Sequence, residues 1–201
     1  MIQNIIFDVA KVLMEYQPEE YAAGLGGDPQ KMQEAVRASM DYPDWYKIDL
    51  GTVSEEETFR NIALANPGCA REIQLFHEHW YEMFQPMEGM EELLERLQKA
   101  GYRLYYLSNF PQRAFEYVKE KLGAFRYADK GLVSYEVELV KPDPAIYRAM
   151  LDRFGLQAEQ SVFTDDRPAN TAAAAALGFS THTFTTARRL EEYLLGMGLK
   201  F

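Results

Sequence analysis

The sequence predicts an α/β fold with a Rossmann-like parallel sheet core and an inserted helical cap. After residue 86, short apolar runs typical of buried strands alternate with amphipathic stretches of about ten residues typical of helices. Strands joined through helices of this length need crossover connections, which make the sheet parallel. Residues 14–85 interrupt the alternation with helical pieces alone. We therefore expect a core from residues 1–13 and 86–201, and a cap from residues 14–85.

The first element is a buried strand at residues 2–7, an apolar run that ends at Asp8. The cap should contain three or four helices. Ser54 is followed by three glutamates, the pattern of a capping box at a helix start. The expected helix starts are Pro18, Asp28-Pro29, Ser54 and Ala70.

The second half of the chain alternates regularly between helix and strand. Leucines that share one helical face, and glycines that end the helices, set the boundaries. The expected helices are 90–100, 111–122, 144–154 and 169–177, and the expected strands are 103–107, 131–134, 161–164 and 180–184.

Composition excludes several classes of protein. The chain has 201 residues, enough for one domain with an insertion, and its 21 Lys+Arg against 31 Asp+Glu give a net charge of −10. Without a basic stretch, binding to nucleic acid is not expected. The single cysteine, Cys69, excludes a disulfide framework. No apolar run approaches the roughly 20 residues that span a bilayer, so we expect a cytoplasmic protein without a membrane partner. Its oligomeric state stays open.

Polar side chains follow three of the predicted strands. Ligands of an open parallel sheet bind beyond the carboxyl ends of its strands, so these side chains should share one crevice. Several carboxylates this close together need a cation, and hard oxygen ligands suit Mg²⁺ beside a phosphate. A lysine and a serine would donate to that phosphate, and an aspartate could attack it. The side chains concerned are Asp8, Ser108, Asn109, Lys141, Asp165 and Asp166.

Four motifs in this order resemble the haloacid dehalogenase-like hydrolase superfamily, over nearly the whole chain. The motifs are Phe7-Asp8-x-x-x-Val12-Leu13, Leu107-Ser108-Asn109, Lys141-Pro142-Asp143-Pro144 and Phe163-Thr164-Asp165-Asp166-Arg167-Pro168-x-Asn170. The chain looks most like the branch with bacterial sugar-phosphate phosphatases, such as glucose-1-phosphate phosphatase, and the phosphatase domain of soluble epoxide hydrolase.

The resemblance implies an Mg²⁺-dependent phosphomonoesterase that acts on a small phosphorylated metabolite, first of all a sugar phosphate. Asp8 would be the nucleophile that forms an aspartyl-phosphate. Ser108 and Lys141 would hold the phosphate, with Asn109 close by. The metal would be bound by Asp8, Asp166 and the backbone carbonyl of Ala10, and Asp165 would ligate or support it.

The first motif departs from the family at two positions. Most of these phosphatases carry a second aspartate, as general acid and base, where this chain has Ala10. Proton transfer of that kind is worth about 10²–10⁴-fold in rate. The sugar-phosphate branch also tends to lack this aspartate. Lys11 stands where Gly or Asn is usual, so it either strains the turn by roughly 1 kcal/mol or contacts the phosphate.

Two other functions stay open. One is 2-haloacid dehalogenation on the same fold, a reaction that needs no metal and leaves the Asp165-Asp166 pair unexplained. The other is a weakly active or inactive protein that binds a phosphometabolite, which Ala10 and Lys11 would explain. In the cap, Tyr42, Trp45 and Tyr46 fall in what we expect to be an irregular loop, and one of them could face the substrate.

Overall fold

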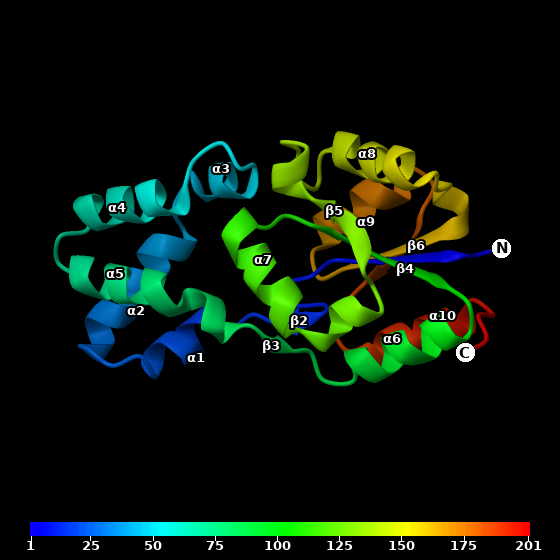
Figure 1. Cartoon of the computed structure of the whole chain (residues 1–201), viewed down its shortest axis with the longest axis horizontal. Helices are drawn as coiled ribbons and strands as arrows, with labels where there is room; N and C mark the ends of the chain where they lie inside the picture. The colour runs from blue at the N-terminus through cyan, green and yellow to red at the C-terminus, as the bar shows by residue number, and fades with distance from the viewer.

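A computed structural model describes residues 1–201, and its centre is a five-stranded parallel sheet in the order β5-β4-β1-β6-β7, with helices on both faces (Figure 1). This confirms the predicted fold class. The strands of this sheet are β1 (Asn4–Phe7), β4 (Arg103–Ser108), β5 (Lys130–Val133), β6 (Ser161–Asp165) and β7 (Ser180–Thr183).

Side chains of the central strands alternate between two apolar layers. Ile5 and Phe7 pack on one face of the sheet with α6 (Met90–Lys99), α7 (Gln112–Lys121) and α10 (Ala187–Gly196). Ile6 packs on the other face with α8 (Pro144–Phe154) and α9 (Pro168–Ala175). Because both faces are covered, the central strand β1 reads as the continuous apolar run Ile5-Ile6-Phe7, as is usual in parallel sheets.

Strand register brings the functional segments to one edge of the sheet. Phe7 pairs with Tyr106 of β4 on one side and with Thr164 of β6 on the other. The residues that follow in each strand therefore emerge side by side at the carboxyl edge. Asp8, Ser108 and Asp165 all stand there, as the sequence predicts for an open parallel sheet.

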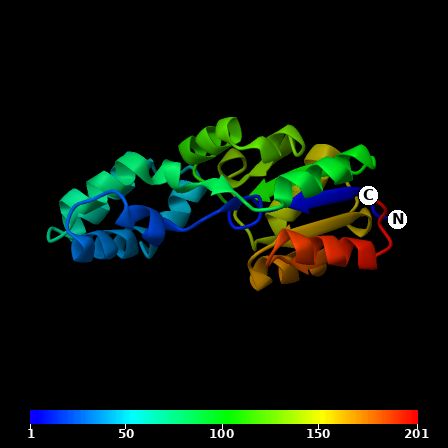
Figure 2. The same cartoon turned by 90° about the horizontal axis from the view of Figure 1, so that it is seen from below.

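Five helices lie between two short strands, β2 (Met14–Glu15) and β3 (Gln85–Pro86), which pair antiparallel. Figures 1 and 2 show these helices grouped at one end of the molecule, beyond the carboxyl edge of the sheet. We call residues 16–84 the helical insertion. The β2–β3 ribbon joins this insertion to the rest of the chain, and the division into core and cap at residues 14 and 85 stays a prediction. The helices are α1 (Pro18–Ala23), α2 (Pro29–Met40), α3 (Trp45–Asp49), α4 (Glu55–Ala65) and α5 (Ala70–His79).

Local signals explain the helix starts that the sequence predicts. Ser54 Oγ accepts a hydrogen bond from the backbone N–H of Glu57, so the cap of α4 forms. Asp28 likewise accepts bonds from the N–H groups of Gln30 and Lys31 at the start of α2. The remaining expected helices and strands occur within two residues of their predicted ends.

Two helices and two strands were not predicted. Trp45 begins helix α3 where we expected an irregular loop, and β2 and β3 are too short for a periodic signal. Helix α10 was also missed, although its leucines Leu190 and Leu194 are buried against the core. Short 3₁₀ turns complete the chain at 80–83, 123–126, 134–136 and 158–160. None of the helices is long and apolar enough to cross a membrane.

Candidate active site

Asp8 stands one residue beyond β1 with only 7% of its surface exposed. Its Oδ1 atom accepts a hydrogen bond from the Val9 N–H at 2.7 Å and another from Ser108 Oγ at 2.8 Å. Lys141 Nζ lies 2.8 Å from the same oxygen. The other oxygen, Oδ2, has no donor within hydrogen-bond distance. One oxygen is therefore fixed, and the other is free to form a new bond.

Lys141 is the central cation of the site and is almost fully buried. Its ammonium contacts Asp8, Asp165 Oδ2 at 2.7 Å and the Leu107 carbonyl at 2.9 Å. Asn109 fixes the backbone at Lys141 from both sides, since its Nδ2 donates to the Lys141 carbonyl and its Oδ1 accepts from the Lys141 N–H. The side-chain amide of Asn109 thus positions the lysine.

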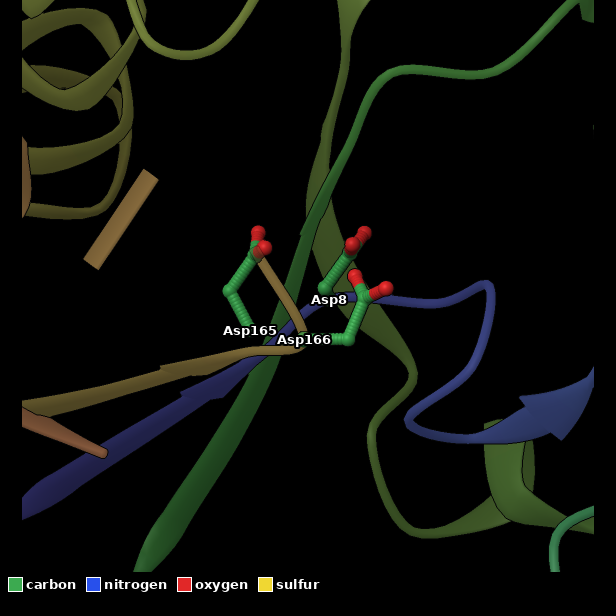
Figure 3. Close-up of side chains that lie close together, drawn as sticks. All are labelled: Asp8, Asp165 and Asp166. Carbon is green, nitrogen blue, oxygen red and sulfur yellow. The ribbon is translucent and has the colours of Figure 1, made fainter. Parts of the chain in front are cut away.

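The two aspartates at the end of β6 have different surroundings. Asp165 is fully buried, and both of its oxygens are occupied by Lys141, by the side chain of Asn170 and by the Arg167 N–H. Asp166 has neither a hydrogen-bond donor nor an ion-pair partner on its side chain. In Figure 3 the carboxylates of Asp8 and Asp166 lie next to each other, and that of Asp165 lies to one side.

The three carboxylates could together hold a cation. Asp8, Asp165 and Asp166 each offer an oxygen, and these oxygens lie within 4.8 Å of one another. Three carboxylates beside one lysine leave a local excess of negative charge that a divalent ion would balance. An all-oxygen set with one unpaired carboxylate fits Mg²⁺, which prefers such ligands and keeps several waters.

The electrostatics of the site reflect burial and crowding. Burial raises the pKa of Asp8 to about 6, while Lys141 acts in the opposite direction. Burial, followed by repulsion from Asp165, also raises the pKa of Asp166. For Lys141, burial disfavours the charge, but Asp8 and Asp165 outweigh it and the pKa lies above its ordinary value. The lysine is therefore a permanent positive charge beside Asp8.

The loop after Asp8 carries the two departures from the usual motif. Ala10 lines the cleft without a group that can transfer a proton. Lys11 has a φ of 60°, so this lysine occupies the left-handed region that glycine adopts without cost. The ammonium of Lys11 lies 5.7 Å from the centre of the Tyr16 ring, and Lys11 also lines the cleft. The turn therefore accommodates a lysine in the left-handed region, and this lysine brings a positive charge to the cleft.

A cleft of about 420 Å³ opens above Asp8, between the carboxyl edge of the sheet and the helical insertion. The insertion supplies an aromatic wall. Trp45 packs edge-on against Trp80, with ring centres 5.6 Å apart, and Phe84 packs against Trp80 at 5.7 Å. Tyr42 and Tyr46 do not line the cleft. The residues that line it are Asp8, Ala10, Lys11, Tyr16, Trp45, Asp49, Trp80, Phe84, Asn109, Phe110, Pro111, Lys141, Asp166, Arg167 and Asn170.

The structure brings together every site residue named from the sequence, and it adds others. The role of each residue stays a prediction at this point. Asn170 was part of a quoted motif, but its two bonds to Asp165 were not anticipated. Asp49, at the end of α3, was missed altogether. Nothing in its sequence neighbourhood indicates a site, because it faces the cleft only when the insertion packs over the sheet.

Comparisons with known proteins agree with this geometry. A family model described as haloacid dehalogenase-like hydrolase matches residues 2–178. The chain is 24% identical over 195 residues to flavin mononucleotide hydrolase 1 of Arabidopsis thaliana, a chloroplast protein, with 97% of this chain and 77% of the relative covered. It is 30% identical over 101 residues to (S)-2-haloacid dehalogenase 4A of Burkholderia cepacia, covering 50% of this chain and 44% of that protein.

Among solved structures, the HAD family enzyme BT-2542 of Bacteroides thetaiotaomicron superimposes with a TM-score of 0.73 at 21% identity. The match covers 96% of this chain and 98% of that enzyme. At this identity the likeness shows the fold. Together with the family model, which spans most of the sequence, it identifies the chain as a hydrolase that belongs to the haloacid dehalogenase-like family.

Proposed function

We propose that this protein is an Mg²⁺-dependent phosphomonoesterase that acts on a small phosphorylated metabolite through an aspartyl-phosphate on Asp8. The observation that carries the proposal is the state of the Asp8 carboxylate at the floor of the cleft. Oδ1 is held by three donors, whereas Oδ2 has none. A carboxylate held in this way can attack an electrophile without reorganising its surroundings.

In the proposed reaction, Asp8 Oδ2 attacks phosphorus and displaces the leaving oxygen. Lys141 lies beside the attacking carboxylate, so its ammonium offsets the charge of a phosphoryl group bound there. Ser108 Oγ donates to Asp8 and stands close enough to share that role. Water then attacks the phosphorus of the aspartyl-phosphate, which releases inorganic phosphate and restores the Asp8 carboxylate.

Mg²⁺ would be held by Asp8, Asp166 and the backbone carbonyl of Ala10. When bound, the ion would neutralise charge on the phosphate and orient it. The unpaired carboxylate of Asp166 supports this assignment. From the sequence, Asp165 would either bind the metal or support the metal site. Because Lys141 and Asn170 occupy its oxygens, we favour the supporting role, in which Asp165 positions these two side chains. The Bacteroides enzyme is also known as a magnesium complex.

The proposed substrate class is a sugar phosphate or a compound of similar size. The cleft of about 420 Å³ accommodates a small ligand, and its aromatic wall of Trp45, Trp80 and Phe84 suits the apolar face of a sugar ring. Polar groups at the floor would fix the phosphate. Relatives named for flavin mononucleotide and phosphoglycolate widen the set of substrates to be tested.

Dehalogenation is the weaker alternative, although some relatives carry that name. An Asp nucleophile and a lysine would serve both reactions. Asp166 distinguishes them, because a reaction without metal leaves this partly buried carboxylate next to Asp8 with no ion-pair partner. The unpaired carboxylate therefore favours the phosphatase.

Release of inorganic phosphate from a defined panel tests the proposal. The panel contains glucose 1-phosphate, glucose 6-phosphate, glycerol phosphate, phosphoglycolate, flavin mononucleotide and 4-nitrophenyl phosphate, each with Mg²⁺ and with EDTA. We expect Mg²⁺-dependent release that is absent in Asp8→Asn. Binding of these compounds with no release would instead support a binding protein, and chloride release from a 2-haloacid in EDTA would support a dehalogenase.

A further inference from the structure

Proton transfer is the part of the reaction that the residues described so far leave unassigned. An alkoxide leaving group needs a proton, and the water that attacks the aspartyl-phosphate must lose one. Ala10 has no side-chain group for this task. If the protein hydrolyses alkyl phosphates, another side chain in the cleft has to supply the proton.

We propose that Asp49 of the helical insertion is the general acid and base of this enzyme, an inference that rests on the proposed phosphatase function. Asp49 is the last residue of α3 and lines the cleft together with Asp8, Lys141 and Asp166. Its carboxylate makes no hydrogen bond and no ion pair. It is the one acidic side chain in the cleft that neither attacks phosphorus nor stands in the predicted metal cluster.

The other titratable groups in the cleft are committed elsewhere. Lys141 is held by two carboxylates, the Lys11 ammonium lies 5.7 Å from the centre of the Tyr16 ring, and the guanidinium of Arg167 offers N–H donors only. The Tyr16 hydroxyl donates to Met40 Sδ at 2.7 Å, and burial raises its pKa. None of the three histidines lines the cleft. Outside the nucleophile and the predicted metal cluster, the Asp49 carboxyl is thus the one acidic group in the cleft that is free to exchange a proton with a bound ligand.

The backbone at Asp49 is anchored to the core, so the carboxylate has a defined position over the site. Ser134, directly after β5, donates from Oγ to the Asp49 carbonyl and accepts from the Phe110 N–H at 3.1 Å. Gly51 has a φ of 72°, and a Cβ there would lie 3.1 Å from Tyr135 Cβ. These contacts hold the end of α3 against the core (Figure 1).

The local electrostatics suit a group that both gives and takes a proton. Burial raises the pKa of Asp49 to about 7, and repulsion from Asp8 and Glu55 adds to the effect, whereas Lys141 and Arg167 oppose it. A value near the working pH is the one expected for an efficient acid–base catalyst. The substrate phosphate would add a further negative charge nearby and favour the protonated form before the first step.

Each step then balances. The Asp8 Oδ2–phosphorus bond forms, the bond from phosphorus to the leaving oxygen breaks, and the Asp49 proton moves to that oxygen to give the free alcohol. The Asp49 carboxylate next takes a proton from water as the water oxygen bonds to phosphorus. The bond from phosphorus to Asp8 breaks, inorganic phosphate leaves and Asp49 is protonated again.

Leaving-group chemistry provides a sharp test with Asp49→Asn. For the alkyl phosphate of the panel that the wild type hydrolyses fastest, kcat should fall about 10²–10⁴-fold. With 4-nitrophenyl phosphate, whose leaving group has a pKa of about 7 and needs little protonation, the first turnover should stay within about threefold of wild type. Later turnovers should be slow, because water lacks its base. Rapid mixing should therefore show a burst of one nitrophenolate per active site.

Two further variants serve as controls. Asp44→Asn makes the same chemical change at the start of α3, where the Asp44 side chain is 48% exposed, pairs with Lys47 and does not line the cleft, so its kinetics should match the wild type. Adding Ala10→Asp to Asp49→Asn places a carboxylate where most relatives have their acid–base group. We expect this double variant to regain at least tenfold in kcat on the alkyl phosphate.

The outcomes separate this inference from the proposed function. If Asp49→Asn keeps kcat on the alkyl phosphate within about threefold, the inference is wrong and the phosphatase stands. If the variant loses the first turnover on both substrates to the same extent, Asp49 positions the ligand and the acid–base role is refuted. A wild type that releases no phosphate from any panel member overturns both. Circular dichroism of Asp49→Asn should match the wild type in each case, and its thermal unfolding should show no loss of stability.

Discussion

Replacing Lys141 with methionine should destabilise the protein more than any exposed substitution does. The change keeps most of the side-chain volume and removes a buried ammonium that contacts Asp8 at 2.8 Å, Asp165 at 2.7 Å and the Leu107 carbonyl at 2.9 Å. Two carboxylates would be left in the interior without their cation. Removing one partner of a buried ion pair typically costs about 3–5 kcal/mol. For a chain of this length, that corresponds to roughly 6–20 °C in Tm.

The loss should depend on pH in a defined direction. Lys141 lowers the pKa of Asp8, which burial holds at about 6, so the pKa should rise further when the lysine is removed. When folding raises the pKa of an acid, that acid stabilises the folded protein at pH values below its pKa in the unfolded chain. This stabilisation is lost as the pH rises through its pKa in the folded protein. The deficit of Lys141→Met should therefore be largest at about pH 8 and smaller at about pH 5.5, where Asp8 can take up a proton.

Urea unfolding followed by circular dichroism measures this effect, in EDTA so that no metal replaces the missing charge. Lys99→Met is the matched control, because that lysine is exposed and pairs only with Glu95 on the surface of α6. It should unfold like the wild type. A loss below about 1 kcal/mol for Lys141→Met at pH 8, or the same loss at both pH values, would refute the assignment of Lys141 as the charge that holds the buried carboxylates.

Three further outcomes follow from the same geometry. Turnover should decline as the pH falls through the pKa of Asp8, because the attacking group is the carboxylate. This pKa is about 6, or lower when Mg²⁺ is saturating, and a rate that rises on acidification would contradict the prediction. Asp166→Asn should weaken Mg²⁺ binding, measured by calorimetry, by on the order of 10–100-fold or more, and an unchanged affinity would remove Asp166 from the metal site. Asn170→Ala leaves Asp165 without its amide donor and should cost about 1–3 kcal/mol in urea unfolding, whereas a neutral result would show that other donors replace it.

Much of the fold was predictable because local and long-range signals agree in the core. Buried strands such as residues 104–107, Leu-Tyr-Tyr-Leu, are continuous apolar runs, and the polar residues that follow them mark the carboxyl edge of the sheet. The candidate site could be predicted for the same reason, since parallel register alone brings Asp8 next to β4 and β6. Helix α10 was missed although Leu190 and Leu194, four residues apart, lie on one helical face, so its sequence did indicate an amphipathic helix.

The insertion was less predictable because tertiary contacts decide its details. Helix α3 has only five residues, too few to be stable alone, and it is held by the packing of Trp45 on Trp80 and of its last residue on Ser134. The strands β2 and β3 exist only as a pair. Asp49 could not be identified as a site residue from its neighbours, because its place over Asp8 depends on how the insertion packs on the core.

The central claim is that Asp8 becomes phosphorylated during turnover. The most direct measurement is an acid quench of the Mg²⁺-loaded wild type while it hydrolyses 4-nitrophenyl phosphate, followed by peptide mass spectrometry. We predict one phosphoryl group per chain at most, carried by the peptide that contains Asp8 and absent in Asp8→Asn. Steady phosphate release with no phosphorylated Asp8 peptide, together with full activity of Asp8→Asn, would contradict the account.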